Sequence, residues 1–406
     1  MTCSAKKTLL IISQVYAPDP AAVGQHITDV AEEMNRRGWR VIVYASARGY
    51  DDPSQRYPSR ERRNGVDVRR LPLSSFGKRS IAIRLIAQSL FMLQATFLGL
   101  LTRRLSVVLV STSPPFAGLG GSLLSMCRRV PLVWWVMDLN PDQMIAAGKI
   151  RKQSLAARVF DWINRFAMRQ ARDIVVLDRF MEDRVLAKLH VAEKSHVIPP
   201  WPHDDRLSYG PPKPNPFRSA QGLDEAFVVM YSGNHAIQHP LDTLLEAAAR
   251  MENDLSLRFV FIGGGAGKAA VDARVTAGAR NIVSLPYQPL EQVSESLSAA
   301  DVHVVTMGDD MVGIIHPCKI YGALAVGRPI LYFGPEQSHA GAILTGMRFG
   351  RSVRHGDVAG TISAIRDLMR LDDAERAALG REAAALAADR YSRKAALGQF
   401  CDILEG

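Results

Sequence analysis

The chain has 406 residues, of which 47% are hydrophobic and 22% are charged, a composition that excludes a disordered or fibrous protein. This length suggests two domains of roughly 200 residues each. The formal net charge of +10 is unevenly distributed: residues 1–200 contain 30 Lys/Arg and 16 Asp/Glu (net +14), and residues 201–406 contain 20 and 24 (net −4). The basic half predicts an anionic partner: nucleic acid, a phosphorylated substrate or a membrane surface.

The cysteines are scattered along the chain without the paired spacing of a zinc site or a disulfide framework. They are Cys3, Cys127, Cys318 and Cys401. No secretory signal is recognised, because Lys6 and Lys7 lead directly into a short apolar strand. We therefore expect a cytoplasmic protein.

The first half of the chain alternates between apolar strands and segments with helical spacing. Residues 9–12 and 41–45 read as strands, and residues 25–37 between them carry apolar side chains on one helical face. This is a βαβ unit, the building block of an open α/β sheet. Gly24 precedes the helix, where a glycine either lets a ligand approach the backbone or simply makes a turn. The loop lacks G-x-G-x-x-G, so a dehydrogenase-type dinucleotide fold is weakly supported.

Residues 81–101 are apolar, have basic flanks and are nearly long enough to span a bilayer. Four polar residues inside this segment argue against a span: Arg84, Gln88, Ser89 and Gln94. Two interpretations stay open. The segment is either a helix at a membrane interface or a core helix of the first domain.

Asp138 and Asp142 follow the predicted strand at residues 132–136. An open parallel sheet binds ligands beyond the carboxyl ends of its strands, so Asp138 is a candidate site residue. The alternative is a helix cap or a solvated loop residue.

Prolines crowd into residues 199–216, a composition typical of a linker between domains. We expect one domain over residues 1–198 and a second over residues 217–391. A helical break near residue 392 predicts that the last helix, residues 392–406, crosses back onto the first domain.

The second domain repeats the α/β alternation, and candidate ligand-contacting residues follow three of its strands. They are Gly233, Asn234 and His239 after residues 227–231, Gly264 and Gly265 after residues 257–262, and Tyr287 and Gln288 after residues 282–285. At the glycines the backbone either approaches a ligand or simply turns.

A further strand, a glycine-bearing loop and a helix beginning near Pro317 predict an anion pocket. Free backbone N–H groups and the positive end of the helix dipole converge there, and Lys319 adds a full charge. Gly313, Ile314 and His316 lie in the same stretch. We interpret it as the site of a nucleotide-sugar diphosphate. The alternative is a solvated helix lysine beside an ordinary loop.

Five motifs occur in an order that resembles retaining glycosyltransferases of family 4, especially bacterial enzymes of surface-polysaccharide and O-antigen assembly. They are residues 16–24 (YAPDPAAVG), 113–115 (SPP), 138–142 (DLNPD), 231–234 (YSGN) and 317–321 (PCKIY). The resemblance covers nearly the whole chain. It implies an α/β fold class with two Rossmann-like domains facing across a cleft (the GT-B architecture), the second of which binds the nucleotide sugar.

The resemblance further implies transfer of a sugar from a nucleoside diphosphate sugar to a saccharide or polyprenyl-linked acceptor, with retention and without a metal or other cofactor. Lys319 and Asp138 are the expected catalytic residues. The first domain would face the acceptor and an anionic membrane surface, as a peripheral protein on the inner face of the cell membrane. No recognised motif supports a nucleic-acid partner.

The chain also departs from the family pattern. A pair of glutamates found in many members would fall at Ile314 and Gly322, and its phosphate-binding Arg and Lys would fall at Asn234 and His239. Charge neutralisation would then depend mainly on Lys319, with His239 or His316 assisting. Two alternatives follow from these departures: a nucleotide-sugar 2-epimerase of the same architecture, or a catalytically silent scaffold.

Overall fold

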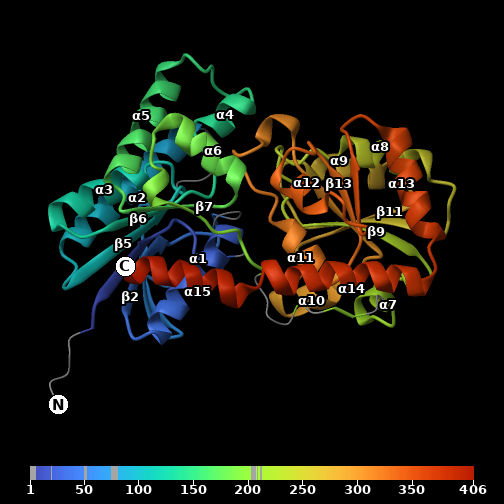
Figure 1. Ribbon diagram of the computed structural model, residues 1–406, viewed down its shortest axis with the longest axis horizontal. Helices are drawn as coiled ribbons and strands as arrows, with labels where there is room; N and C mark the ends of the chain where they lie inside the picture. The colour runs from blue at the N-terminus through green and yellow to red at the C-terminus, as the bar shows by residue number, and fades with distance from the viewer. Residues whose placement is uncertain are drawn as a thin grey trace. The chain divides into compact units, whose positions relative to one another are not determined.

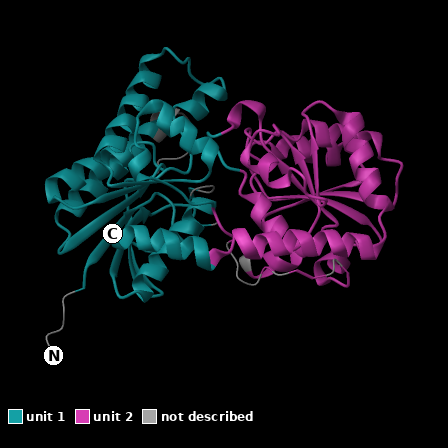
Figure 2. Cartoon of the chain, in the orientation of Figure 1, with its two compact units in different colours: residues 1–199, 313–316, 394–406 teal, residues 200–312, 317–393 magenta. Residues whose placement is uncertain are grey.

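The computed structural model describes residues 6–19, 21–49, 53–74, 81–202, 207, 209–210 and 213–406. Residues 203–206, 208, 211 and 212 of the predicted linker lie outside this part, as does Cys3. The chain divides into two compact units (Figure 2). Unit 1 contains residues 1–199, 313–316 and 394–406, and unit 2 contains residues 200–312 and 317–393.

Unit 1 is built on an eight-stranded sheet in the order β3-β4-β2-β1-β5-β6-β7-β8, parallel except for β3 (Figure 1). The strands are β1 Thr8–Ile12, β2 Arg40–Ser46, β3 Arg60–Arg63, β4 Val66–Leu71, β5 Leu105–Ser111, β6 Leu132–Trp135, β7 Asp173–Val176 and β8 Ser195–Val197. All five residues of β1 are buried, as expected for a parallel strand covered on both faces. The strand order reverses between β1 and β5, which makes this sheet Rossmann-like.

Helices cover the sheet of unit 1. They are α1 Ala22–Arg36, α2 Ile81–Leu100, α3 Ala117–Arg128, α4 Asp142–Ala146, α5 Leu155–Gln170, α6 Arg179–Lys188, the 3-10 turn Ala192–Lys194 and α15 Arg393–Glu405. The apolar face expected for the first helix is confirmed, since Ile27, Val30, Ala31 and Met34 of α1 are buried. Among the described helices, none combines the length and apolar content needed to cross a bilayer.

Unit 2 has a six-stranded parallel sheet in the order β11-β10-β9-β12-β13-β14, with its switch point between β9 and β12. The strands are β9 Phe227–Ser232, β10 Leu257–Ile262, β11 Ile282–Leu285, β12 Val302–Thr306, β13 Ile330–Phe333 and β14 Gly350–Val353. Its helices are α7 Pro216–Ala220, α8 Asp242–Arg250, α9 Lys268–Thr276, α10 Val293–Ser298, α11 Lys319–Ala325, α12 His339–Leu344, α13 Val358–Arg370 and α14 Asp373–Arg390, with 3-10 turns at Leu290–Gln292 and Asp309–Met311. The predicted α/β class with two Rossmann-like sheets is confirmed.

The two faces of the second sheet have separate apolar cores. Tyr231 and Phe261 point into the core that α8 and α13 cover. Met230 and Val260, their neighbours along the strands, point into the core on the other face, with Phe217. This alternation is the period of two that a strand buried on both faces requires.

The C-terminal helix α15 packs on the first unit, as predicted (Figure 1). The ring of its buried Phe400 lies 4.2 Å from that of Trp135, measured between centroids. Arg37, at the end of α1, donates hydrogen bonds to Asp402 (2.6 Å) and Glu405 (2.9 Å). The helix is therefore held by an apolar contact and by a charged network.

One segment differs from the expected division. Residues 313–316, which the sequence places in the second domain, group with unit 1. The backbone N–H of Leu139 donates to the carbonyl of Ile314 (2.9 Å), and His316 Nδ1 lies 2.6 Å from Asp178 Oδ2. Because of these contacts with the loops after β6 and β7, residues 313–316 group with unit 1, although the residues on either side of them in the sequence belong to unit 2.

The docking of α15 is testable with Phe400→Ala. We expect the free energy of unfolding of unit 1 to fall by about 3–5 kcal/mol, because the change opens a cavity beside Trp135. Lys394→Ala, at an exposed position of the same helix, is the control and should change it by less than about 0.5 kcal/mol. Urea unfolding measures both, and equal midpoints for the two variants would contradict the packing described.

Candidate functional site

The loops that follow β9 and β10 are bound to one another through their backbones. The N–H of Gly233 donates to the carbonyl of Ile262 (2.9 Å), and that of His235 to the carbonyl of Gly264 (2.7 Å). The N–H of Gly267 in turn donates to the carbonyl of His235 (2.7 Å). The predicted glycine turn and the predicted β9 loop therefore form one structure at the carboxyl edge of the sheet.

Glycine is required at these positions by close contact as well as by conformation. Gly263 has φ +123°, and a Cβ there would lie 2.1 Å from the carbonyl oxygen of Gly233. Gly265 has φ +119°, and its Cβ would lie 2.2 Å from Asn234 Oδ1. The sequence predicts a close backbone approach at these glycines. In the structure this approach is a contact between the loops after β9 and β10.

Lys319 begins α11 and lies against the β9 loop. A Cβ on Gly233 would come within 2.8 Å of Lys319 Cε, and Lys319 Nζ lies 5.1 Å from the centre of the Tyr231 ring. Burial lowers the pKa of this ammonium to about 8. No described carboxylate forms an ion pair with it, so the contact with the Tyr231 ring is its main electrostatic compensation. A cation in this state favours an incoming anion.

The neighbouring histidines are neutral at physiological pH. His239 Nδ1 donates to the carbonyl of Thr306 (2.7 Å), and burial, followed by the charge of Lys319, lowers its pKa to about 3. His235 Nδ1 donates to the carbonyl of Gly233 (3.0 Å), and burial lowers its pKa to about 4. The charge that His239 was expected to supply is therefore absent in the free protein, and its Nε2 is an acceptor there.

A second lysine near the glycine turn is already engaged. Lys268 Nζ donates to the carbonyls of Phe261 (2.8 Å) and Leu285 (2.9 Å), which fixes it at the ends of β10 and β11. Sequence reasoning did not single out Lys268 or His235. Their signal is their position, directly after or within the glycine-rich loops.

Tyr287 and Gln288 lie at the exposed end of β11. The Tyr287 ring comes within 3.2 Å of where a Cβ of Gly264 would lie, so it packs along the glycine turn while 42% of the residue stays exposed. The Gln288 side chain donates to the carbonyl of Pro286 (2.9 Å). An aromatic edge beside an open glycine surface is a suitable place for a planar ligand group.

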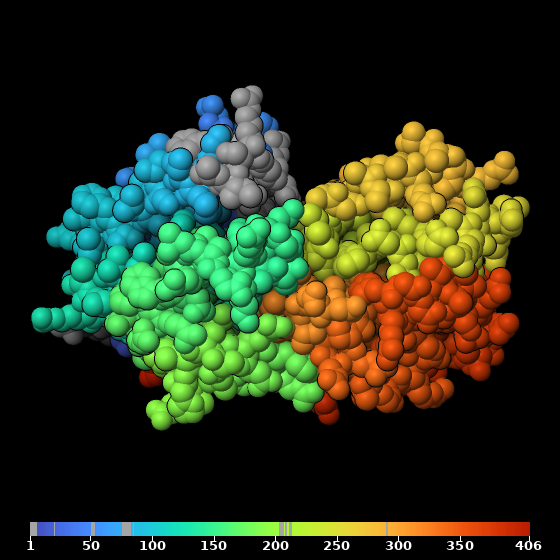
Figure 3. Space-filling model, turned by 90° about the horizontal axis from the view of Figure 1, so that it is seen from above, coloured from blue at the N-terminus to red at the C-terminus, as the bar shows by residue number. Residues whose placement is uncertain are grey.

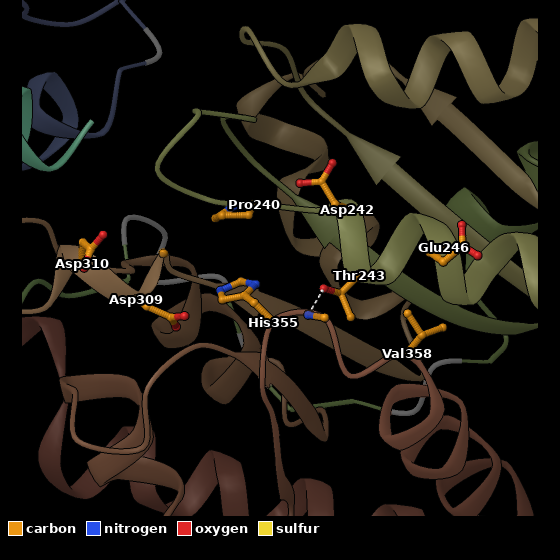
Figure 4. Close-up of a pocket in the computed structure, with 10 residues that line it drawn as sticks. Pro240, Asp242, Thr243, Glu246, Asp309, Asp310, His355 and Val358 are labelled. Carbon is orange, nitrogen blue, oxygen red and sulfur yellow. Dashed lines mark hydrogen bonds between the residues drawn. The ribbon is translucent and has the colours of Figure 1, made fainter. Parts of the chain in front are cut away.

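A cavity of about 510 Å³ lies elsewhere at this edge of unit 2, and Lys319 does not line it (Figure 4). Four carboxylates surround it: Asp242, Glu246, Asp309 and Asp310. An anionic diphosphate would be repelled there, so this cavity is not the predicted anion pocket. Figure 4 shows the acids spread around the cavity rather than pointing at one ion.

The remaining candidates lie in unit 1. Gly313 has φ +69°, and a Cβ there would lie 2.3 Å from the carbonyl oxygen of Phe180. Asp178, which the sequence did not single out, caps α6 by accepting the N–H of Met181 (2.9 Å) and binds His316 with its other oxygen. His316 is therefore a buried partner of Asp178 in unit 1, whereas Lys319, three residues later, belongs to unit 2.

Asp138 lies beyond the carboxyl end of β6. Thr112 Oγ1 fixes the backbone at this point by accepting the N–H groups of Met137 (3.1 Å) and Asp138 (3.0 Å). Burial raises the pKa of the Asp138 carboxyl to about 6, and no described cation forms an ion pair with it. A carboxyl with such a pKa is suited to proton transfer near neutral pH. Asp142, by contrast, is paired with Lys188 (2.8 Å).

Gly24 lies near the start of α1 and is buried. Its φ is ordinary, but a Cβ there would lie 3.3 Å from the backbone of Val15 and Tyr16. The close approach at Gly24 is therefore made by the loop after β1.

The sequence comparisons identify the first part of the chain, since residues 21–201 match the glycosyl transferase 4-like domain. The first part of the chain is therefore similar to that domain. It is 26% identical over 302 residues to "Probable glycosyltransferase WbjE" of Pseudomonas aeruginosa, covering 73% of this chain and 74% of that protein. It is 23% identical over 333 residues to WcaI of Escherichia coli (strain K12), named for colanic acid biosynthesis, covering 79% and 81%.

Solved structures show the same GT-B fold. Anabaena HepE, determined in complex with UDP-glucose, matches with a TM-score of 0.70 and 16% identity over 98% of this chain and 99% of that one. Agreement over almost the full length of both chains means that the similarity in fold extends beyond residue 201, into unit 2.

The glycine contact is tested by Gly263→Ala. We expect it to lower the free energy of unfolding by about 1–3 kcal/mol more than Gly278→Ala, because both positions have a positive φ but only Gly263 meets backbone. Gly278 has no atom within 4 Å of an added Cβ and is the matched control. Urea unfolding compares the pair, and equal losses would mean that the two loops are not in contact.

The buried carboxyl is tested by Asp138→Asn. The folded-state pKa of about 6 lies above the ordinary value near 4, so ionisation destabilises the folded state above pH 6. We expect the variant to gain about 1–3 kcal/mol at pH 8, with the gain shrinking as the pH falls from 6 to 4. Asp142→Asn, which loses the ion pair with Lys188, should not be stabilised. Melting temperatures across this pH range measure both, and a gain independent of pH would contradict the assignment.

Proposed function

We propose that this protein is a glycosyltransferase that moves a sugar from a nucleoside diphosphate sugar to a saccharide acceptor carried on a polyprenyl lipid, with retention, in bacterial polysaccharide biosynthesis. The observation that carries the proposal is Lys319. Its partly buried ammonium lies beside the glycine loop of β9, at the switch point of a Rossmann-like sheet, and has no carboxylate partner among the described residues. Open sheets of this type bind nucleotides at that point.

The chemistry needs a group that receives negative charge. As the bond from the sugar to the diphosphate breaks, charge develops on the leaving phosphate, and a pre-oriented ammonium stabilises it more in the transition state than in the ground state. The burial of Lys319 strengthens this interaction, and a bound diphosphate would raise the lysine pKa from about 8, so that the ammonium stays charged. His239 Nε2 would accept a hydrogen bond or gain a proton beside the same anion.

Asp138 is the proposed second catalytic residue. With a pKa of about 6 it is mostly ionised at neutral pH, so it would accept the proton of the acceptor hydroxyl or stabilise positive charge at the reacting carbon. The names of WbjE and WcaI support the polysaccharide setting. The complex of HepE makes UDP-glucose the first donor to test.

The role of Lys319 is tested by Lys319→Met, which keeps the side-chain length and removes the charge. We expect kcat to fall by about 10²–10³-fold, while the melting temperature stays equal or rises because a buried charge is removed. Lys213→Met, at an exposed position of unit 2, is the control and should leave both values unchanged. Release of UDP from a panel of UDP sugars, with and without acceptor, measures turnover.

Product analysis in the same assay separates the alternatives. A glycosylated acceptor supports the proposal, whereas an epimerised nucleotide sugar formed without acceptor would replace it with a 2-epimerase. Nucleotide binding by calorimetry without turnover of any donor would indicate a silent scaffold. Unchanged turnover in Lys319→Met would remove the central argument.

A further inference from the structure

The Lys319 ammonium lies against an aromatic ring instead of a carboxylate. Its Nζ is 5.1 Å from the centre of the Tyr231 ring, and among the described residues no acid forms an ion pair with it. Tyr231 belongs to β9 and is fully buried in the core that α8 and α13 cover, whereas Lys319 is partly exposed. The ring therefore occupies the inner side of the ammonium, and the outer side stays accessible.

The Tyr231 ring is held in place by its own loop. Its hydroxyl donates a hydrogen bond to the carbonyl of Asn234 (2.8 Å), three residues along the chain. The imidazole of His235 packs against it in a T-shaped arrangement, with 4.8 Å between the ring centroids and 72° between the planes. His235 is itself fixed, because its Nδ1 donates to the carbonyl of Gly233 (3.0 Å). The ring that faces Lys319 is therefore restrained from turning away.

The segments that carry the ring and the lysine meet at the surface of unit 2. The stem of Lys319 lies along the β9 loop, since a Cβ on Gly233 would come within 2.8 Å of Lys319 Cε. Asn234 in the same loop is exposed. Figure 3 shows the residues around 240 in yellow and those around 330 in orange as neighbours on the surface of unit 2. An anion can therefore approach the ammonium from solvent without displacing the ring.

A ring and a carboxylate stabilise a cation in different ways. A carboxylate would neutralise the ammonium and compete with an incoming diphosphate, whereas the face of an aromatic ring attracts a cation and carries no net charge. Of the titratable side chains near the lysine, His235 and His239 are neutral at physiological pH, and the Cys318 thiol favours the charged form of the lysine. The charge of Lys319 is therefore held in place without being cancelled.

We propose that Tyr231 is the positioning residue of Lys319: its ring fixes the ammonium beside the glycine loops and leaves the full charge available to the diphosphate of the donor. This inference rests on the proposed function, because it assigns the group that holds the cation of that same site. In this role Tyr231 acts only through Lys319. Its hydroxyl orients the ring, since it bonds the backbone of the loop.

The proposal is tested by Tyr231→Leu, which keeps an apolar side chain and removes the ring. We expect kcat/KM for UDP release at pH 8 to fall by about tenfold, because the ammonium is less stable and less well placed without the ring. The loss should shrink at pH 6, where the lysine is still protonated, because the alkaline limit of kcat/KM moves down by about 0.5–1 pH unit. Tyr231→Phe keeps the ring and should restore kcat/KM to within about threefold of the wild type.

Phe259→Leu, which removes another buried ring of the same core, is the matched control. It should lower the melting temperature without moving the pH profile of kcat/KM. Tyr231→Met also lacks a ring and fills its space more closely, so it carries the same expectation where Tyr231→Leu does not fold.

A double-mutant cycle with Lys319→Met separates positioning from a purely structural role. If Tyr231 acts through Lys319, Tyr231→Leu should lower kcat/KM by no more than about twofold in the Lys319→Met background. An equal loss in both backgrounds, or a loss that is the same at pH 6 and pH 8, would overturn the proposal and leave the proposed function intact. Unchanged turnover in Lys319→Met alone would instead reject the proposed function, and this inference with it.

Discussion

The function proposed for unit 2 depends on the ammonium of Lys319, a largely buried cation for which the described residues supply no carboxylate partner. Contact between Gly263 and Gly233 brings two loops together, and the stem of Lys319 lies on the surface they make. Burying this ammonium costs free energy in the free protein, as its lowered pKa records, and a bound anion would offset that cost. Because His235 and His239 are neutral, the positive charge near these loops comes from Lys319 and Lys268, and the Lys268 ammonium is already bound to backbone carbonyls.

Much of the fold is predictable from the sequence because parallel strands buried on both faces are short, uninterrupted apolar runs. Residues 257–262 and 282–285 match β10 and β11 for this reason. β3 has no such signal, since its sequence is Arg-Glu-Arg-Arg and it pairs at the sheet edge, although Asn64-Gly65 is a hairpin turn signal. β3 is a strand because it pairs with β4, and the spacing of apolar residues in the sequence gives no sign of that pairing.

The site was predictable to the extent that it follows from strand order. Loops at the carboxyl ends of adjacent parallel strands must meet, so Gly233, Gly264 and Lys319 could be grouped in advance. The grouping of residues 313–316 with unit 1 could not, because it depends on a hydrogen bond to Leu139 and on the Asp178–His316 contact. In the sequence Asp178 has the position of an ordinary helix cap, and in the structure it is one. The neighbouring sequence therefore gives no sign that it also binds His316.

The excess of Lys/Arg over Asp/Glu in the first half of the chain is concentrated in one part of it. Several of its arginines are paired with nearby acids, as Arg70 is with Glu61 and Arg165 with Asp161. The cations around α2, α3 and α5 have almost no acid near them in sequence, and the carboxyl of Asp138 stays unpaired even in this basic stretch. Burial raises the pKa of this carboxyl to about 6, and none of the described cations is close enough to offset that rise. The same segment thus supplies cations to the surface and a protonatable carboxyl to the edge of the sheet. An ion pair between them would neutralise the cation and lower the pKa of the carboxyl, so the two roles require the groups to stay apart.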